Sequence, residues 1–432
     1  MKKRYPFWTQ TLYRIEDVWY VFVMELRRIF RDGGVMLIFF GAGVFYPLLY
    51  PMIYLHEAIV DMPIAVVDEC DSQHSREYIR KLDACRDVRV VYKCMNLSEA
   101  RQLYEQRKIH GVVMIDKDFE RAISTVGEQA MVSVYCDMSS FLYYKNLLQA
   151  SNFVMLDEHV GIQTHRYQLL GNDRAMAELL SQPMRYESQM LYNPGTGYPS
   201  FLLPAVLMLI VYQTLFFGIC MLAGIAREEN GELYFIEGRK YDRSTFRLVF
   251  GRGMAYLTLY MAIGSYVLLV VPRIFGLPHI GMSIDILKLL VPFLLATIFF
   301  AMTLSVFIRE RETGMVMFLF TSIPLLFLTG CSWPTASMPQ FWKIFAMLFP
   351  STWGVNGFLH INSCGATLWE TRREYYILWA QAGIYFFTAC ASYMIFGWYY
   401  AKTNRQYLLR MLRLRRRQMQ AGKWRLRPAA SA

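Results

Sequence analysis

The sequence is poor in charged residues. Asp, Glu, Lys and Arg make up 18% of its 432 residues, whereas soluble domains carry about 25%. Hydrophobic residues make up 55% and gather in long runs that almost lack charge. This distribution excludes an ordinary soluble protein and predicts a polytopic α-helical membrane protein, because a span needs about 20 mostly apolar residues.

The motifs of nucleotide and metal chemistry are missing as well. The phosphate-binding patterns GxxxxGKS and GxxxxGKT do not occur, which excludes ATP binding through a P-loop. HExxH, GxSxG and paired CxxC motifs are also absent. The eight cysteines fit no zinc-binding spacing, and both disulfides and buried thiols stay open for them. We therefore expect no catalysis, and no metal or cofactor bound by this chain.

Two small polar groups come nearest to a ligand site. Asp68, Asp71 and His74 follow an apolar run, where they would either cradle a polar ligand or form a capped strand-to-helix turn; the turn is the favoured interpretation. The nearest metal-like cluster is Asp157, Glu158, His159 and His165. Its two histidines lie six residues apart, so one helix face does not hold both of them. A solvated helix is expected there.

Six apolar runs are long enough to span a bilayer. They cover residues 34–55, 199–223, 253–272, 286–308, 315–331 and 376–400. The first run is too long for a cleavable signal, so we expect it to remain as a span. Almost no ionisable residue lies at mid-depth, which argues against a proton-coupled carrier. Among the mild polar residues of the spans, the candidates for a substrate path are Gln213, Thr214, Thr321 and Ser322.

Positive charge is concentrated beside the spans. Four segments hold 25 of the 45 Lys and Arg residues: 1–34, 224–252, 309–313 and 401–432. Basic short loops stay in the cytoplasm, so both termini are predicted to lie inside. The segments predicted to lie outside are 56–198, 273–285 and 332–375. The net charge of +11 thus signals topology rather than nucleic-acid binding, and the basic tail 401–432 is expected to lie against anionic lipid.

Residues 56–198 have the pattern of a separate domain between the first two spans. Strands are predicted at 62–68, 88–94, 111–116 and 131–137. Helices are predicted at 75–85, at 97–110 with Ser98 as its cap, and as a stalk over 139–185. Strands that alternate with helices favour a largely parallel sheet, so an extracytoplasmic α/β domain is expected. The other five spans follow it within residues 199–400.

The segments beside the spans also carry patterns. Residues 1–33 predict an amphipathic elbow helix lying flat in the membrane interface, with a helix packed on a partner protein as the alternative. Its apolar face consists of Ile15, Val18, Trp19, Phe22, Val23, Leu26, Ile29 and Phe30. The outer segment 332–375 is rich in Trp, Phe and Pro, which predicts a short interfacial or re-entrant helix.

Four motifs stand in order along the chain: ELRRIFRD (25–32), PIAVVDECDSQHSR (63–76), LYNPGTGYPSFLLP (191–204) and LFLTGCSWPTASMPQFWKIFAMLFPSTWGVNGF (326–358). Together they resemble the permease subunit of a type-2 ABC exporter, in the bacterial branch with a large periplasmic domain between the first two spans. The resemblance covers nearly the whole chain. It implies an elbow helix that contains Glu25, Arg27, Arg28, Arg31 and Asp32. It also implies an outer gate marked by Pro334, Met338, Pro339, Trp342 and Pro350.

The resemblance gives a role to the dense charge of REENGELYFIEGRKYDRSTF (227–246). In the family this loop, 224–250 here, contains the coupling helix that docks on the cytosolic ATPase. The implied contact residues are Arg227, Glu228, Glu229, Gly231, Glu232 and Leu233, with Phe235 and Ile236 extending the apolar anchor. An apolar anchor with a charged rim gives a small surface both affinity and register. A solvated amphipathic loop is the alternative.

We therefore expect a multi-pass permease of the bacterial inner membrane, with both termini cytoplasmic, that exports a drug-like, lipid-like or envelope substrate. The resemblance implies a homodimer or heterodimer, a separate ATPase that uses ATP and Mg, and a periplasmic adaptor as a further partner. The alternative is a membrane-anchored binding or scaffold protein whose outer domain recognises a ligand. A secondary carrier would show an inverted repeat, and the loop pattern has none.

Overall fold

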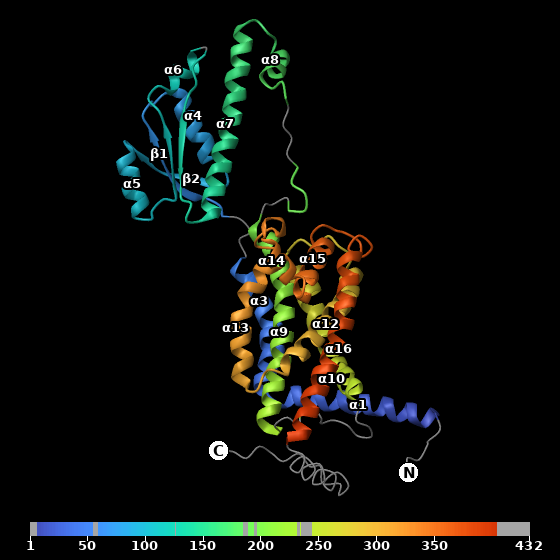
Figure 1. The fold of residues 1–432 in the computed structure, drawn as a ribbon. Coiled ribbons are helices and arrows are strands. Elements are labelled where there is room, and N and C mark those ends of the chain that lie inside the picture. The colour runs from blue at the N-terminus through green and yellow to red at the C-terminus, as the bar shows by residue number, and fades with distance from the viewer. Residues whose placement is uncertain are drawn as a thin grey trace. The chain divides into compact units, whose positions relative to one another are not determined.

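The computed structural model describes residues 7–54, 59–125, 127–184, 189–193, 197–230, 234 and 244–403. The chain forms two compact units (Figure 1). One is His56–Tyr198, and the other is formed by the sequence on both sides of it.

The larger unit is a helix bundle. Up to residue 54 it contains α1 (Phe7–Arg31), α2 (Gly33–Met36), the π-helix η1 (Leu37–Phe45) and α3 (Tyr46–Ile53). The later elements are α9 (Tyr198–Asn230), α10 (Thr245–Ser265), η3 (Tyr266–Val270), α11 (Val271–Ile274), α12 (Ser283–Ser305), α13 (Arg311–Leu328), η4 (Thr335–Ser337), α14 (Gln340–Ala346), α15 (Pro350–Asn362) and α16 (Arg372–Thr403). Helix α9 forms the centre, because 94% of its most apolar stretch is buried.

The described part of the chain holds four helical stretches that are long and apolar enough to cross a membrane. They are Gly33–Ile53, Tyr198–Glu229, Thr245–Ile274 and Ser283–Ser305. They overlap the first four predicted spans, and this indicates a polytopic membrane protein. Helices α13 and α16 cover the predicted fifth and sixth spans, but they are not among these four stretches, so a total of six spans stays a prediction.

The smaller unit contains a four-stranded sheet in the order β2-β1-β3-β4. Its strands are β1 (Met62–Asp68), β2 (Val88–Cys94), β3 (Gly111–Ile115) and β4 (Val132–Cys136). The first three are parallel, and β4 pairs antiparallel with β3. All four strands lie within the short apolar runs that predicted them, because a buried strand is short and rich in β-branched residues.

Helices cover both faces of this sheet. The helices of the unit are α4 (Gln73–Asp83), α5 (Leu97–Glu105), α6 (Phe119–Ser124), α7 (Phe141–Leu169) and α8 (Arg174–Ser181). One hydrophobic core joins side chains of α4 and α7 to β1, including Leu82, Leu147 and Ile64. A second core lies between α5 and the other side of the sheet, around Ala65 and Ala100. The two cores give the unit the layered architecture of an α/β domain.

Side-chain hydrogen bonds to the backbone hold the turn before α4 and the start of α5. Asp68 Oδ1 accepts the backbone N–H groups of Cys70 and Asp71 at 3.1 and 3.0 Å, so the turn after β1 is held by its own carboxylate, as the favoured interpretation predicted. The predicted cap Ser98 is wrong. Asn96 has the extended backbone of a cap (φ −150°, ψ 164°) and its side chain accepts the N–H of Glu99, a geometry that Ser98 lacks because it is already helical.

Helix α1 lies within the predicted elbow segment 1–33, and it packs on the bundle through two acidic side chains. On its predicted apolar face Ile15, Trp19 and Phe30 are exposed and Ile29 is buried. Asp17 and Glu25 are buried as well. The reason is electrostatic: Asp17 pairs with Arg247 at 2.9 Å and Glu25 with Arg252 at 3.4 Å, both on α10. The exposed apolar face remains available for a membrane interface.

Candidate functional site

The end of α9 is fastened to the turn between α12 and α13. The guanidinium Nη1 of Arg227 donates to the backbone carbonyls of Val306 at 2.8 Å and Ile308 at 2.6 Å. Arg227 is only 6% exposed. Carbonyls at a helix C-terminus have no partner within the helix, so a cation placed there satisfies them and complements the helix dipole. Arg227, predicted to contact an ATPase, thus holds two helices of its own chain together.

Glu228 secures the other side of the same turn. Its Oε1 accepts the backbone N–H of Arg311 at 2.7 Å, at the first residue of α13. The local cap position, Glu310, makes no side-chain cap bond. A carboxylate from α9 therefore supplies the capping interaction that α13 does not make for itself, and its negative charge suits the positive end of the helix dipole.

Close backbone packing supports this contact. A Cβ added at Gly224 of α9 would lie 2.8 Å from the carbonyl oxygen of Glu310. The end of α1 joins the same place, because Asp32 Oδ2 lies 3.4 Å from Arg311 Nη2. Asp32 Oδ1 also accepts the N–H groups of Gly34 and Val35, so it caps α2. We call the junction of Arg227, Glu228, Asp32 and the 306–311 turn the α9 clamp.

The remaining predicted coupling residues divide into two groups. Glu229 is exposed at the end of α9. Gly231, Glu232, Leu233, Phe235 and Ile236 lie outside the described residues. Tyr234, which sequence reasoning did not select, is described and is 1% exposed. The signal that marks it is the apolar run 233–236 at the centre of the charged loop, of which Tyr234 is a member.

The predicted elbow residues have different environments. Glu25 is completely buried, with Arg28 Nη1 3.4 Å from its carboxylate. Arg27 and Arg31 are exposed. Arg252, the partner of Glu25 on α10, lies directly before the predicted span 253–272 and was therefore not among the predicted site residues. The sequence does contain a signal for it. An Arg beside a membrane span needs a neutralising partner, and the amphipathic helix offers acidic residues.

The predicted substrate-path residues serve helix packing. Gln213 Nε2 on α9 donates to the carbonyl of Ser322 on α13 at 3.3 Å. Thr214 and Thr321 donate to carbonyls of their own helices, at Ile210 and Met317. The structure thus brings Gln213 and Ser322 together, as a polar link between two helices of the bundle.

The predicted outer gate is a fastened short helix. Pro334 and Pro339 precede η4 and α14, and Pro350 is the first residue of α15. Pro suits these positions because its fixed φ and missing N–H are tolerated at a helix start. Met338 is buried, while Trp342 is half exposed on α14.

Helix α16 and helix α15 hold the end of α14 through its free carbonyls. The side-chain N–H groups of Gln381 and Trp353 both donate to the carbonyl of Met347, at 2.9 and 3.1 Å. The hydroxyl of Tyr385 donates to the carbonyl of Leu348. The C-terminal end of α14 is therefore anchored to α15 and α16. Phe341 and Trp342 at its start remain exposed.

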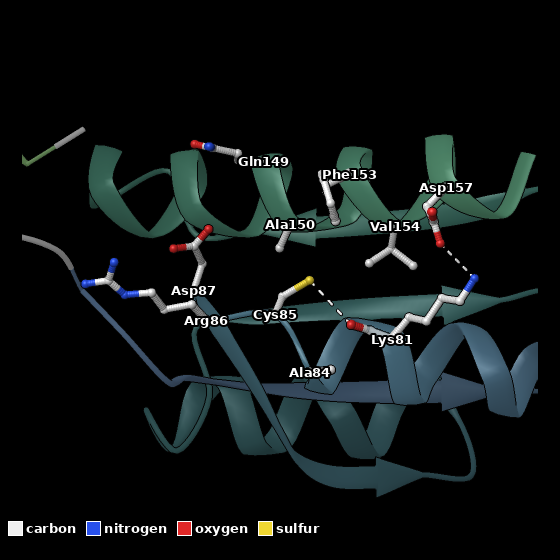
Figure 2. A pocket seen from close by; sticks show the side chains of 10 residues that line it. All are labelled: Lys81, Ala84, Cys85, Arg86, Asp87, Gln149, Ala150, Phe153, Val154 and Asp157. Atoms are coloured by element: carbon white, nitrogen blue, oxygen red, sulfur yellow. Dashed lines mark hydrogen bonds and ion pairs between the residues drawn. The ribbon is translucent and has the colours of Figure 1, made fainter. Parts of the chain in front are cut away.

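The α/β unit carries a surface cavity of about 490 Å³ between α4 and α7 (Figure 2). Lys81 and Asp157 meet across one end of it, with Lys81 Nζ 2.8 Å from Asp157 and 2.9 Å from Glu158. Partial burial opposes the charged ammonium, yet the hydrogen bonds that Lys81 donates to Asp157 and Glu158 raise its pKa. Burial raises the pKa of the Cys85 thiol on the cavity wall, so the thiolate is disfavoured there.

The bundle of long apolar helices indicates a polytopic membrane protein, and comparison with known proteins gives the family. Residues 34–391 match the family described as ABC-2 family transporter protein. The chain therefore belongs to this family of transport subunits, which implies an ATPase partner. This confirms the family that the four motifs indicated.

A similar protein of known name is the linearmycin resistance permease protein LnrN of Bacillus subtilis (strain 168). It is 22% identical over 377 residues, which cover 84% of this chain and 95% of that protein. The shared region therefore includes most of the helix bundle and the α/β unit.

Proposed function

We propose that this chain is the membrane subunit of an ATP-driven exporter in the bacterial inner membrane, acting as a dimer with a separate ATPase. The observation that carries the proposal is the α9 clamp. Arg227 and Glu228 bind the carbonyls of one helix end and the N–H of the next. A push on the end of α9 would therefore move α9, α12 and α13 as one piece, which is what coupling to an ATPase requires.

The substrate that fits this bundle is hydrophobic or amphipathic. The Gln213 amide donates to the backbone carbonyl of Ser322, and the sequence of the spans has almost no ionisable residue at mid-depth, which suits an apolar cargo better than a strongly polar one. The relative LnrN is named for linearmycin resistance, which makes linearmycin the first compound to test. Cells that lack the chain should become more sensitive to its substrate.

The deciding experiment is purification of the chain from its native membrane in mild detergent, with identification of stoichiometric partners by mass spectrometry. A co-purifying ATPase with a P-loop is expected. If other membrane complexes survive the same detergent and no ATPase appears, the proposal fails and a scaffold role for the α/β unit takes its place.

Charge reversal at Glu229 should weaken ATPase binding without unfolding the chain. Glu229 is exposed at the end of α9, so Glu229→Arg removes a rim charge of the proposed docking surface. This change is expected to lower the amount of co-purified ATPase about tenfold, which corresponds to a loss of about 1.4 kcal/mol in binding free energy. The measurement is the ATPase-to-permease ratio after purification at low salt.

Two further variants give this prediction its controls. Glu228→Gln should instead lower the melting temperature, because its carboxylate caps α13; a cost of about 1 kcal/mol is expected. Glu69→Arg reverses an exposed charge in the α/β unit and should change neither quantity. Equal ATPase binding by Glu229→Arg and Glu69→Arg would exclude Glu229 from the docking surface.

We also propose that the α/β unit and the 332–375 segment face the periplasm. Cys364 is exposed and follows α15, so a variant that keeps Cys364 as its only cysteine should react with a membrane-impermeant maleimide applied from outside. Spheroplasts are the right sample, because the outer membrane is removed. Labelling that appears only after the inner membrane is permeabilised would reverse the proposed topology.

A further inference from the structure

A buried ion pair joins α1 to α10. Glu25 and Arg252 are both 0% exposed, and a carboxylate oxygen of Glu25 lies 3.4 Å from Nε of Arg252. Removing two charges from water is costly, and well-packed apolar residues often stabilise a protein as well or better. Stability alone therefore does not explain the pair. The other contacts of Glu25 and Arg252 indicate its role.

The pair encloses Tyr234, which lies between α9 and α10 in the sequence. Arg252 Cζ lies 3.9 Å from the centre of the Tyr234 ring, within the range of a cation–π contact. Arg252 Nη2 donates to the carbonyl of Tyr234 at 2.8 Å, and the Tyr234 hydroxyl donates to Glu25 at 3.3 Å. The ring, the carbonyl and the hydroxyl of one residue are thus all held by the same two charged side chains.

Other helices complete the enclosure. Tyr256 of α10 donates to the same Glu25 oxygen at 2.6 Å. Arg28 of α1 lies 5.4 Å from the Tyr234 ring centre, and Arg252 lies 5.8 Å from the ring centre of Tyr393 on α16. The site around Tyr234 therefore touches α1, α10 and α16.

We propose that Glu25 and Arg252 form a socket that anchors the loop between α9 and α10 through Tyr234. This inference rests on the proposed function for its role: Arg252 is a positioning residue that makes the loop deliver ATPase movement to α1, α10 and α16. The α9 clamp fixes the start of the loop at Arg227. A loop fixed at Tyr234 as well transmits force, whereas a free loop would absorb it.

Limited trypsin digestion of the full-length chain in mild detergent tests the socket without any substrate. The loop contains three trypsin sites, Arg239, Lys240 and Arg243, and the exposed Arg309 reports on the 306–311 turn. Arg252→Met should raise the initial cleavage rate at the loop sites about tenfold, because cleavage follows the population of the released loop. The rate at Arg309 should stay unchanged. Arg252→Lys should give a smaller rise, because it keeps the charge but not the planar stacking group.

Arg311→Met is the matched control, because Arg311 also pairs with an acidic residue of the elbow region, at Asp32. It should leave the loop rates unchanged. Equal cleavage rates for Arg252→Met and the unmodified chain, or an equal rise at the loop sites and at Arg309, would overturn the socket. If Arg252→Met does not fold, Tyr234→Ala replaces it, since this change empties the socket and leaves the ion pair in place. The same selective rise is expected, and its absence overturns the proposal.

The proposed role of Arg252 in coupling is tested by measuring ATP hydrolysis and export separately. In the purified complex with its ATPase, Arg252→Lys should keep ATP hydrolysis within about twofold of the unmodified complex and lower export at least about fivefold, since positioning rather than chemistry is lost. Parallel losses of both quantities would contradict a positioning role. If no ATPase binds the unmodified chain, the proposed function fails, while the digestion experiment still decides whether the socket exists.

Discussion

Replacing Arg227 with Met should abolish export and destabilise the helix bundle. The Arg227 guanidinium makes two bonds, to the carbonyls of Val306 at 2.8 Å and Ile308 at 2.6 Å. A hydrogen bond to a charged group contributes about 1.5–3 kcal/mol, and a buried acceptor without a partner adds a further cost. We expect the free energy of unfolding to fall by about 3 kcal/mol, measured as a lower melting temperature in detergent.

Two variants separate the clamp from a general effect of charge. Arg227→Lys keeps the cation but lacks the fork of N–H groups, so its loss should be smaller. Arg309→Met removes an exposed arginine from the same turn and should leave the melting temperature unchanged. If Arg227→Met melts at the temperature of the unmodified chain, then the two carbonyl contacts do not stabilise the junction of α9 with the turn.

This expectation assigns Arg227 a different role from the one that the family resemblance implied. A side chain that is almost fully buried between α9 and the 306–311 turn acts on an ATPase only through that turn. The exposed Glu229 is better placed for direct contact. The two kinds of variant should therefore differ in stability. The Arg227 variants lose stability and export together, whereas the Glu229 variant loses ATPase binding, and export with it, at an unchanged melting temperature.

The sequence predicted those parts of the fold that depend on one-dimensional patterns. The strands β1 to β4 follow from short apolar runs, and the four apolar stretches of the bundle follow from length and lack of charge. Their boundaries were less certain. Helix α10 begins at Thr245, eight residues before the predicted span. The predicted span starts after Arg252, because a charged residue ends an apolar run.

The contacts of the candidate site could not be predicted, because they depend on pairs that are distant in the sequence. A helical wheel gives α1 an apolar face for the membrane interface, and Trp19 on that face is exposed, but the wheel does not show that Glu25 is buried against the bundle. The cause of this burial is Arg252, more than two hundred residues away. In the same way, Glu228 caps α13 across the bundle, and no local pattern near α13 contains that information.

Gly218→Ala is expected to have the largest effect of any single methyl group on the packing of α9. A Cβ at Gly218 would overlap the ring of Phe39 on η1. Phe39 is fully buried, and its ring is 5.2 Å from Tyr260 and 6.4 Å from Tyr256, both edge-to-face. Burial and the two neighbouring tyrosine rings restrict the movement of the Phe39 ring. The helices must separate, and overpacking of this kind costs about 1–3 kcal/mol.

Gly383→Ala provides the matched control for this prediction. Gly383 lies in α16, and a Cβ there would meet nothing within 4 Å among the described residues, so this change should be neutral or slightly stabilising because Ala favours a helix. Phe39→Leu in the Gly218→Ala background should recover part of the loss, since a smaller side chain makes room for the methyl group. Non-additive effects of the two changes in a double-mutant cycle would locate the cost at this contact. Equal melting temperatures for Gly218→Ala and Gly383→Ala would instead mean that α9 tolerates a wider separation from η1, and the close approach of the two helices would then not hold the bundle together.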